Sequence, residues 1–255
     1  MKLAIRNLLL LHLVGNALLL WCGYYWLGLG ESSGGALAWS TFVALVCALA
    51  AIWLHGVALG QFGSDGPWLL RASLKSALRN LPPLLLIALA ASGLYVLLWM
   101  WQVRSSGSAF KLASYLTLKL RKPIKPATVE HVLGVGFWLV RYAVLPVFLL
   151  PFAAAVAGRG WSGFRGRSWG SARRWTYWIE TPALLACAFW VPLKLIAWVP
   201  KMRGFKMEMT SFALRALAAY LLMSGALLAL EVLTGRGIAS AGSPRSSQPT
   251  TVPSP

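Results

Sequence analysis

The sequence predicts an all-α membrane protein with six transmembrane helices and amphipathic segments at the membrane interface. Hydrophobic residues make up 58% of the 255 residues and the mean hydropathy is +0.66, far from the balance of a soluble domain. Six apolar stretches run for roughly 20 residues each, the length with which an α-helix crosses about 30 Å of hydrocarbon. Only three charged residues lie well inside these stretches, so a water-soluble fold is excluded.

The first two spans, residues 8–29 and 37–59, are joined by a short connection of Gly and Ser that contains Glu31. Helices joined by so short a connection run antiparallel, so these spans are predicted to form a hairpin. The third span covers residues 81–101.

The last three spans cover residues 132–157, 181–199 and 212–233. The fourth span contains Pro146 and Pro151, which remove backbone donors and predict a kink. Pro192 lies inside the fifth span, and Glu231 lies near the end of the sixth.

The C-terminal residues 235–255 are rich in Ser, Pro and Thr. Such a segment cannot bury enough apolar surface to offset the entropy of folding. We therefore expect a transmembrane domain over residues 1–234 and a disordered tail over residues 235–255.

The connections between spans hold structure of their own. After the second span, Arg71, Lys75 and Arg79 repeat every four residues opposite a leucine stripe, which predicts a helix lying in the membrane interface. Residues 161–178 mix Trp and Arg at helical spacing and indicate a second such segment, weakened by glycines. Residues 114–122 alternate apolar and polar side chains, which fits a short strand or an interfacial helix equally well.

The net charge of +18, from 24 Lys and Arg against 6 Asp and Glu, would suggest nucleic acid as the partner of a soluble protein. Here the bases lie in short connections beside aromatic residues, where anionic lipid head groups are found. We expect the lipid bilayer, its anionic head groups and other membrane proteins as partners, and no nucleic acid.

The charge distribution also predicts an orientation. Basic residues are only slightly more numerous on the N-terminal side of the membrane, but Lys2 and Arg6 precede the first span while its far end meets Glu31. Because cytoplasmic segments carry more Lys and Arg, we expect both termini in the cytoplasm, in a bacterial inner membrane.

The three cations inside the spans are Arg141, Lys194 and Arg215. A buried cation costs about 2.5–3.5 kcal/mol on insertion scales unless it finds a partner, water or the interface. All three are predicted in the half of the bilayer away from the N-terminus, where they could share one anion or lipid head group. Alternatively, each side chain reaches the interface independently.

His12 and His55 are predicted at similar depth, because they are equally far from the turn of the first hairpin. Two imidazoles at one depth could ligate a haem iron or another metal. Equal depth does not mean that the side chains face each other, and the sequence offers no evident third ligand. No metal and no cofactor is therefore assigned, and these two histidines remain minor candidates.

Enzyme motifs are not found. Residues 160–164 resemble a nucleophile elbow but have Phe164 where the second glycine is required, and Asp65 is the sole aspartate. The sequence thus favours a non-enzymatic membrane component that binds lipid or partner proteins. The alternatives are a small permease or channel for an anionic solute and, more distantly, a bis-histidine haem protein for electron transfer.

Overall fold

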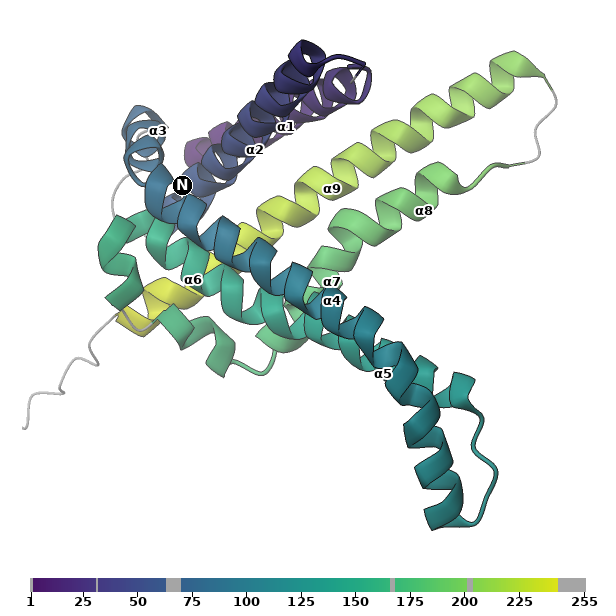
Figure 1. Cartoon of the computed structure of the whole chain (residues 1–255). Coiled ribbons are helices and arrows are strands. Elements are labelled where there is room, and N and C mark those ends of the chain that lie inside the picture. The colour runs from purple at the N-terminus through teal and green to yellow at the C-terminus, as the bar shows by residue number, and fades with distance from the viewer. Residues whose placement is uncertain (1, 31, 63–69, 166–167, 201–203, 243–255) are drawn as a thin grey trace, which may run out of the picture.

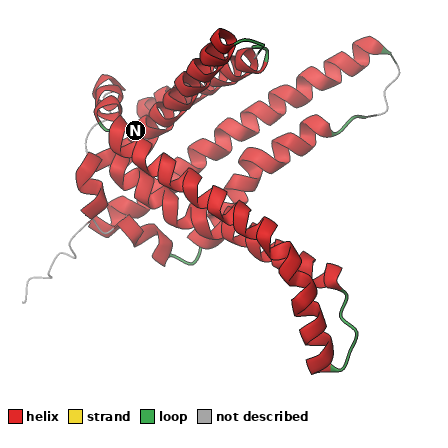
Figure 2. Ribbon diagram, in the orientation of Figure 1, coloured by secondary structure: helices red, strands yellow, loops and turns green. Residues whose placement is uncertain are grey.

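The structure, a computed structural model, describes the chain except for residues 1, 31, 63–69, 166–167, 201–203 and 243–255. All regular structure in this part of the chain is helical (Figure 2). Six helical stretches are long and apolar enough to cross a membrane: Arg6–Leu27, Gly34–Gln61, Leu81–Ser105, Pro126–Arg165, Tyr177–Ala197 and Phe205–Gly235. The predicted six-span all-α fold is therefore confirmed.

The first two helices, α1 (Lys2–Leu27) and α2 (Gly34–Phe62), form the predicted antiparallel hairpin (Figure 1). Near its turn, the indole Nε1 of Trp26 donates a hydrogen bond to Ser40 Oγ at 3.0 Å. Further along, the helices approach so closely that a Cβ on Gly15 would lie 2.6 Å from the Leu54 side chain. The missing side chain of Gly15 thus leaves room for Leu54 between the two helices.

Helix α3 (Leu70–Arg79) connects the hairpin to the third span. The Trp53 indole of α2 donates to the Leu74 carbonyl at 3.3 Å, and Ala77 is buried. The predicted basic face, Arg71, Lys75 and Arg79, is exposed. The helical conformation agrees with the sequence pattern, and the position of α3 in the interface stays a prediction.

Helix α4 (Leu81–Leu120) has 40 residues, so it is about 60 Å long, twice the thickness of the hydrocarbon layer. It contains residues 114–120, for which a strand was one of two alternatives, so that alternative is wrong. The reason lies in its contact with α5 (Pro126–Leu139), where Ala109 and Ala113 pack on Val129. Their spacing of four residues is helical.

The fourth span is continuous through three segments: α5, a π-helical turn η1 (Val140–Val144) and α6 (Leu145–Arg159). The π-helical turn ends just before Pro146, which cannot donate a backbone hydrogen bond. The irregularity predicted for this span thus takes the form of one wide turn. Pro151 lies inside α6 without any change of helix type.

The fifth span repeats this arrangement, with α7 (Tyr177–Leu185), a π-helical turn η4 (Ala186–Trp190) and α8 (Val191–Ala197), which carries Pro192 in its first turn. Before it, residues 160–165 and 168–173 form the short 3₁₀ helices η2 and η3 in place of one amphipathic helix. Their glycines explain the difference, because glycine weakens a longer helix.

The last helix, α9 (Phe205–Gly242), continues past the predicted start of the tail at residue 235. The rest of the predicted tail, residues 243–255, lies outside the described residues.

Three helix pairs, α1–α2, α4–α5 and α8–α9, diverge from a common base, where the end of α2, the start of α4, α6 and the C-terminal part of α9 meet (Figure 1). The base holds the main apolar core, which consists of Leu59, Leu84, Ile87, Ala154, Val156 and Ala157. There the Asn80 amide also donates to the Ala157 carbonyl at 2.9 Å. Within the spans these helices expose large apolar side chains such as Trp21, Leu89 and Leu193, as expected of a surface that faces lipid.

Candidate functional site

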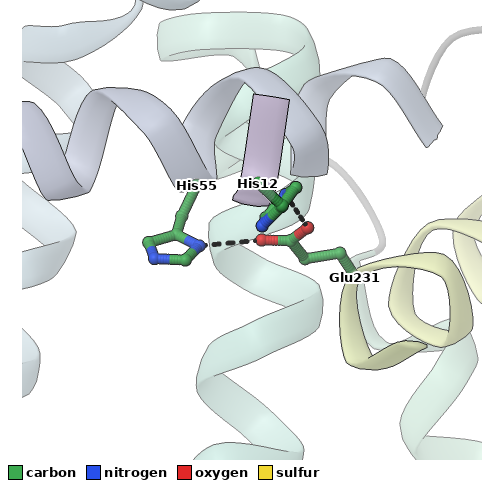
Figure 3. A group of neighbouring side chains, drawn as sticks. All are labelled: His12, His55 and Glu231. Carbon is green, nitrogen blue, oxygen red and sulfur yellow. Dashed lines mark hydrogen bonds and ion pairs between the residues drawn. The ribbon is translucent and has the colours of Figure 1, made fainter. Parts of the chain in front are cut away.

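Three polar side chains from distant parts of the sequence meet inside the membrane domain. His12 lies on α1, His55 on α2 and Glu231 on α9, and the three helices pack against one another at this point (Figure 3). His12, His55 and Glu231 lie six, six and four residues from one end of their spans. In each case it is the end on the same side of the membrane as the N-terminus. At 1.5 Å per residue, the three residues lie about 6–9 Å inside those ends. We call this group the His–Glu–His cluster.

The Glu231 carboxylate lies between the two imidazoles and turns one oxygen to each (Figure 3). His55 Nδ1 donates a hydrogen bond to Glu231 Oε1 at 2.9 Å. His12 Nε2 lies 2.7 Å from Glu231 Oε2. The ring centroids of the two histidines are 5.6 Å apart, and the potential ligand atoms of the cluster all lie within 4.8 Å of one another.

The cluster is buried but incompletely satisfied. His12 is fully buried, the Glu231 side chain is 6% exposed and the His55 side chain is 31% exposed. The approach between His12 and Glu231 is close but lacks hydrogen-bond geometry, so His12 Nε2 and Glu231 Oε2 have no hydrogen-bond partner. The two atoms contact each other only as an ion pair, and two buried polar atoms that face one place can bind a small cation there.

Neighbouring polar residues hold the cluster in position. The buried Asn16 lies one helical turn from His12, and its amide Nδ2 is 3.4 Å from His12 Nδ1. If this amide donates, His12 Nδ1 accepts, and the remaining ring proton of a neutral imidazole lies on Nε2, facing Glu231. On the other side, the Tyr220 hydroxyl of α9 donates to the Leu13 carbonyl of α1.

A second set of contacts fixes α9 one turn beyond Glu231. The hydroxyl groups of Tyr177 and Thr234 are 3.2 Å apart, and Ser171 Oγ donates to the Thr234 carbonyl at 3.4 Å. All three side chains are buried. The depth and rotation of α9 at Glu231 are therefore determined by contacts on both sides of the cluster.

The structure places His12 and His55 side by side, at the equal depth that the hairpin predicts. Glu231 is the member that the sequence analysis did not connect with them. One signal could have suggested it: Glu231 lies at the same end of its span as the two histidines, and a carboxylate within a span needs a buried partner.

The three cations predicted inside the spans have separate surroundings. Arg141 Nη2 donates to Gln102 Oε1 of α4 at 3.1 Å, and the Lys194 ammonium lies over the Trp190 ring, 5.8 Å from its centroid. The Arg215 guanidinium donates to the carbonyls of Ile196, at 3.2 Å, and Trp198, near the end of α8. None of these contacts joins one cation to another, and an anion shared by the three stays a prediction.

Comparison of the chain with protein-family models, with curated protein sequences and with solved structures gives no match.

The candidate chemistry of the site is therefore inferred from the residues of the His–Glu–His cluster. Two imidazoles and one carboxylate are the ligand set of many zinc sites, and one zinc ion at about 2.1 Å from each ligand holds the ligand atoms within about 4.2 Å of each other. To reach this geometry the widest separation in the cluster would narrow, and His12 Nε2 and Glu231 Oε2, which are 2.7 Å apart, would move apart.

A haem fits the cluster less well than a single ion. Bis-histidine ligation needs the two imidazoles on opposite faces of a porphyrin, with the iron between them. In this structure the Glu231 carboxylate occupies the place between His12 and His55 (Figure 3). The arrangement therefore favours one small cation over a macrocycle.

Proposed function

We propose that this chain is a non-enzymatic, multi-pass membrane protein that binds a divalent transition-metal ion at the His–Glu–His cluster. One observation carries the proposal: His12 Nε2 and Glu231 Oε2 are buried within 2.7 Å of each other, and neither has a hydrogen-bond partner. A bound cation would satisfy both atoms and would hold His55 as its third ligand.

The ligand types narrow the class of ion. Imidazole nitrogen suits zinc, copper, iron and nickel, whereas magnesium and calcium prefer oxygen ligands throughout. Three protein ligands leave the fourth position of a tetrahedral zinc ion open. His55 is partly exposed and His12 is fully buried, so an ion would enter and leave the cluster at His55.

Binding is favoured over catalysis because the carboxylate of the cluster is itself a ligand. A hydrolytic zinc site also needs a general base near the open position. Glu231 turns both of its oxygens to the histidines. It is then not free to act as that base.

Zinc titration of the full-length protein in detergent tests the proposal, and cobalt(II) can replace zinc to give a visible absorption band. We expect one ion per chain. His55→Gln and Glu231→Gln should weaken binding at least tenfold, because each removes or neutralises a ligand. His131→Gln is the matched control, since His131 is exposed and lies outside the cluster. Equal binding by all four proteins would overturn the proposal and leave a structural ion pair.

We also propose that the protein lies in a bacterial inner membrane with both termini in the cytoplasm. Six spans put the two ends on the same side, and Lys2 and Arg6 before the first span support the cytoplasmic side. Binding of anionic lipid at the basic face of α3 and association with other membrane proteins remain proposals as well.

A further inference from the structure

A hollow of about 530 Å³ opens between α4 and the start of the fourth span, far from the His–Glu–His cluster along the chain. Polar groups of Arg141, Gln102, Ser105 and Glu130 line it together with the rings of Trp99 and Phe137. A second hollow, of about 260 Å³, adjoins the other side of Arg141 and is lined by Tyr95, Val96 and Trp99. We call the two together the Arg141 pocket.

Among the described residues that line this pocket, Arg141 is the only cation. Its Nη2 donates to Gln102 Oε1, while its Nε is buried without a hydrogen-bond partner. The Tyr95 hydroxyl donates to the Arg141 carbonyl at 2.9 Å and so holds the π-helical turn that carries the side chain. An arginine stays charged in proteins, so its guanidinium in the wall of the pocket favours an anionic ligand.

The two hollows differ in depth and in chemistry. Gln102 and Ser105 lie at the end of the span Leu81–Ser105, whereas Tyr95 and Val96 lie closer to its middle. The outer hollow thus combines polar and apolar groups, whereas the inner one is mainly apolar, and Arg141 lines both. A ligand that fills both has an anionic group beside the guanidinium and an apolar chain directed into the membrane.

Glu130 does not neutralise this site. It precedes Arg141 by eleven residues on one continuous helix, so their Cα atoms are about 16 Å apart along the axis. Eleven residues make about three turns, which puts both on the same helical face. The carboxylate therefore lies at the outer end of the pocket, away from the guanidinium.

We propose that the Arg141 pocket binds a phospholipid, with the phosphodiester on the Arg141 guanidinium and an acyl chain along Tyr95, Val96 and Trp99. A phosphate offers oxygens to the guanidinium group that lines the pocket, and a charge-assisted bond of this kind is about twice as strong as a neutral one. Free phosphate would leave the apolar hollow unfilled, which is why a lipid is the ligand. The proposal is independent of the metal site.

The test measures the melting temperature of the full-length protein in detergent with phosphatidylglycerol, with diacylglycerol or with inorganic phosphate. Phosphatidylglycerol should raise it by several degrees through preferential binding to the folded state, and the other two should not. Arg141→Gln should lose this shift while keeping the helical circular-dichroism spectrum. Arg141→Lys should keep part of it, because lysine retains the charge but not the fork of donors.

One matched variant completes the test. Lys194→Gln removes an exposed cation of another span and should keep the shift. Equal shifts in wild type and Arg141→Gln would overturn the proposal. An equal response to inorganic phosphate would exclude the lipid as the ligand, and an equal response to diacylglycerol would exclude recognition of the phosphate.

Discussion

Replacing Glu231 separates its role as a charge from its role as a hydrogen-bond acceptor. In the metal-free protein both imidazoles turn a nitrogen toward the carboxylate, at 2.7 and 2.9 Å. Glutamine keeps the shape of glutamate but offers one acceptor and one donor group. His12 Nε2 can face the amide oxygen as it faces the carboxylate, while His55 can shift its proton to the other ring nitrogen and accept from the amide.

Glu231→Gln should therefore cost little in the metal-free state, about 1 kcal/mol, the usual net contribution of one hydrogen bond. Glu231→Leu leaves both imidazoles without a partner. Removing one member of a buried charged group costs about 3–5 kcal/mol. With about 2–4 °C per kcal/mol for a chain of this size, the leucine variant should melt on the order of 10 °C lower.

The assay is thermal unfolding of wild type, Glu231→Gln and Glu231→Leu in detergent with a chelator present. We expect the glutamine variant to melt within a few degrees of wild type, well above the leucine variant. If both variants melt equally far below wild type, the charge of Glu231 is needed in the metal-free state. The prediction that Glu231 acts mainly as a hydrogen-bond acceptor, and not through its charge, would then be refuted.

Three further outcomes are expected. Asn16→Leu should weaken zinc binding about 10–100-fold, because an outer residue that orients a ligating histidine typically contributes that much; unchanged affinity would show that Asn16 does not orient His12. A reporter that fluoresces only in the cytoplasm, fused after Leu233, should be bright, whereas a dark fusion with an active periplasmic reporter at the same point would reverse the orientation. A synthetic peptide of residues 68–81 should become helical on anionic vesicles and bind less as salt rises, since the Debye length falls to about 3 Å at 1 M; indifference to salt and lipid charge would contradict an interfacial position for α3.

The six spans could be predicted because composition and length alone decide whether a helix fits a bilayer. The pairing of His12 with His55 was also accessible, since a short turn fixes how two antiparallel helices align. Glu231 was not, because which face of α9 meets the first hairpin depends on packing between helices that are distant in the sequence. The contact of Arg141 with Gln102 could not be predicted either, because it also depends on packing between two helices.

Local irregularities of the helices could also be predicted only in part. Pro146 and Pro151 predicted a kink in the fourth span, and Pro192 was placed inside the fifth. The sequence did not reveal that Pro146 and Pro192 each follow a π-helical turn. The alternation over residues 114–122 left strand and helix open, because a short segment can fit both periods. The contact of Ala109 and Ala113 with Val129 decides it, and that contact depends on how the chain turns back at residues 121–125.

The members of the His–Glu–His cluster enter the membrane at different times during synthesis, some at its beginning and one at its end. His12 and His55 arrive with the first two helices, and Glu231 arrives with the last one. Until α9 inserts, the first hairpin carries two imidazoles in the bilayer without their carboxylate. Docking of α9 therefore gives the two histidines of the hairpin their carboxylate partner. A chain that ends before residue 231 keeps both histidines without this partner, and this distinguishes it from the finished protein.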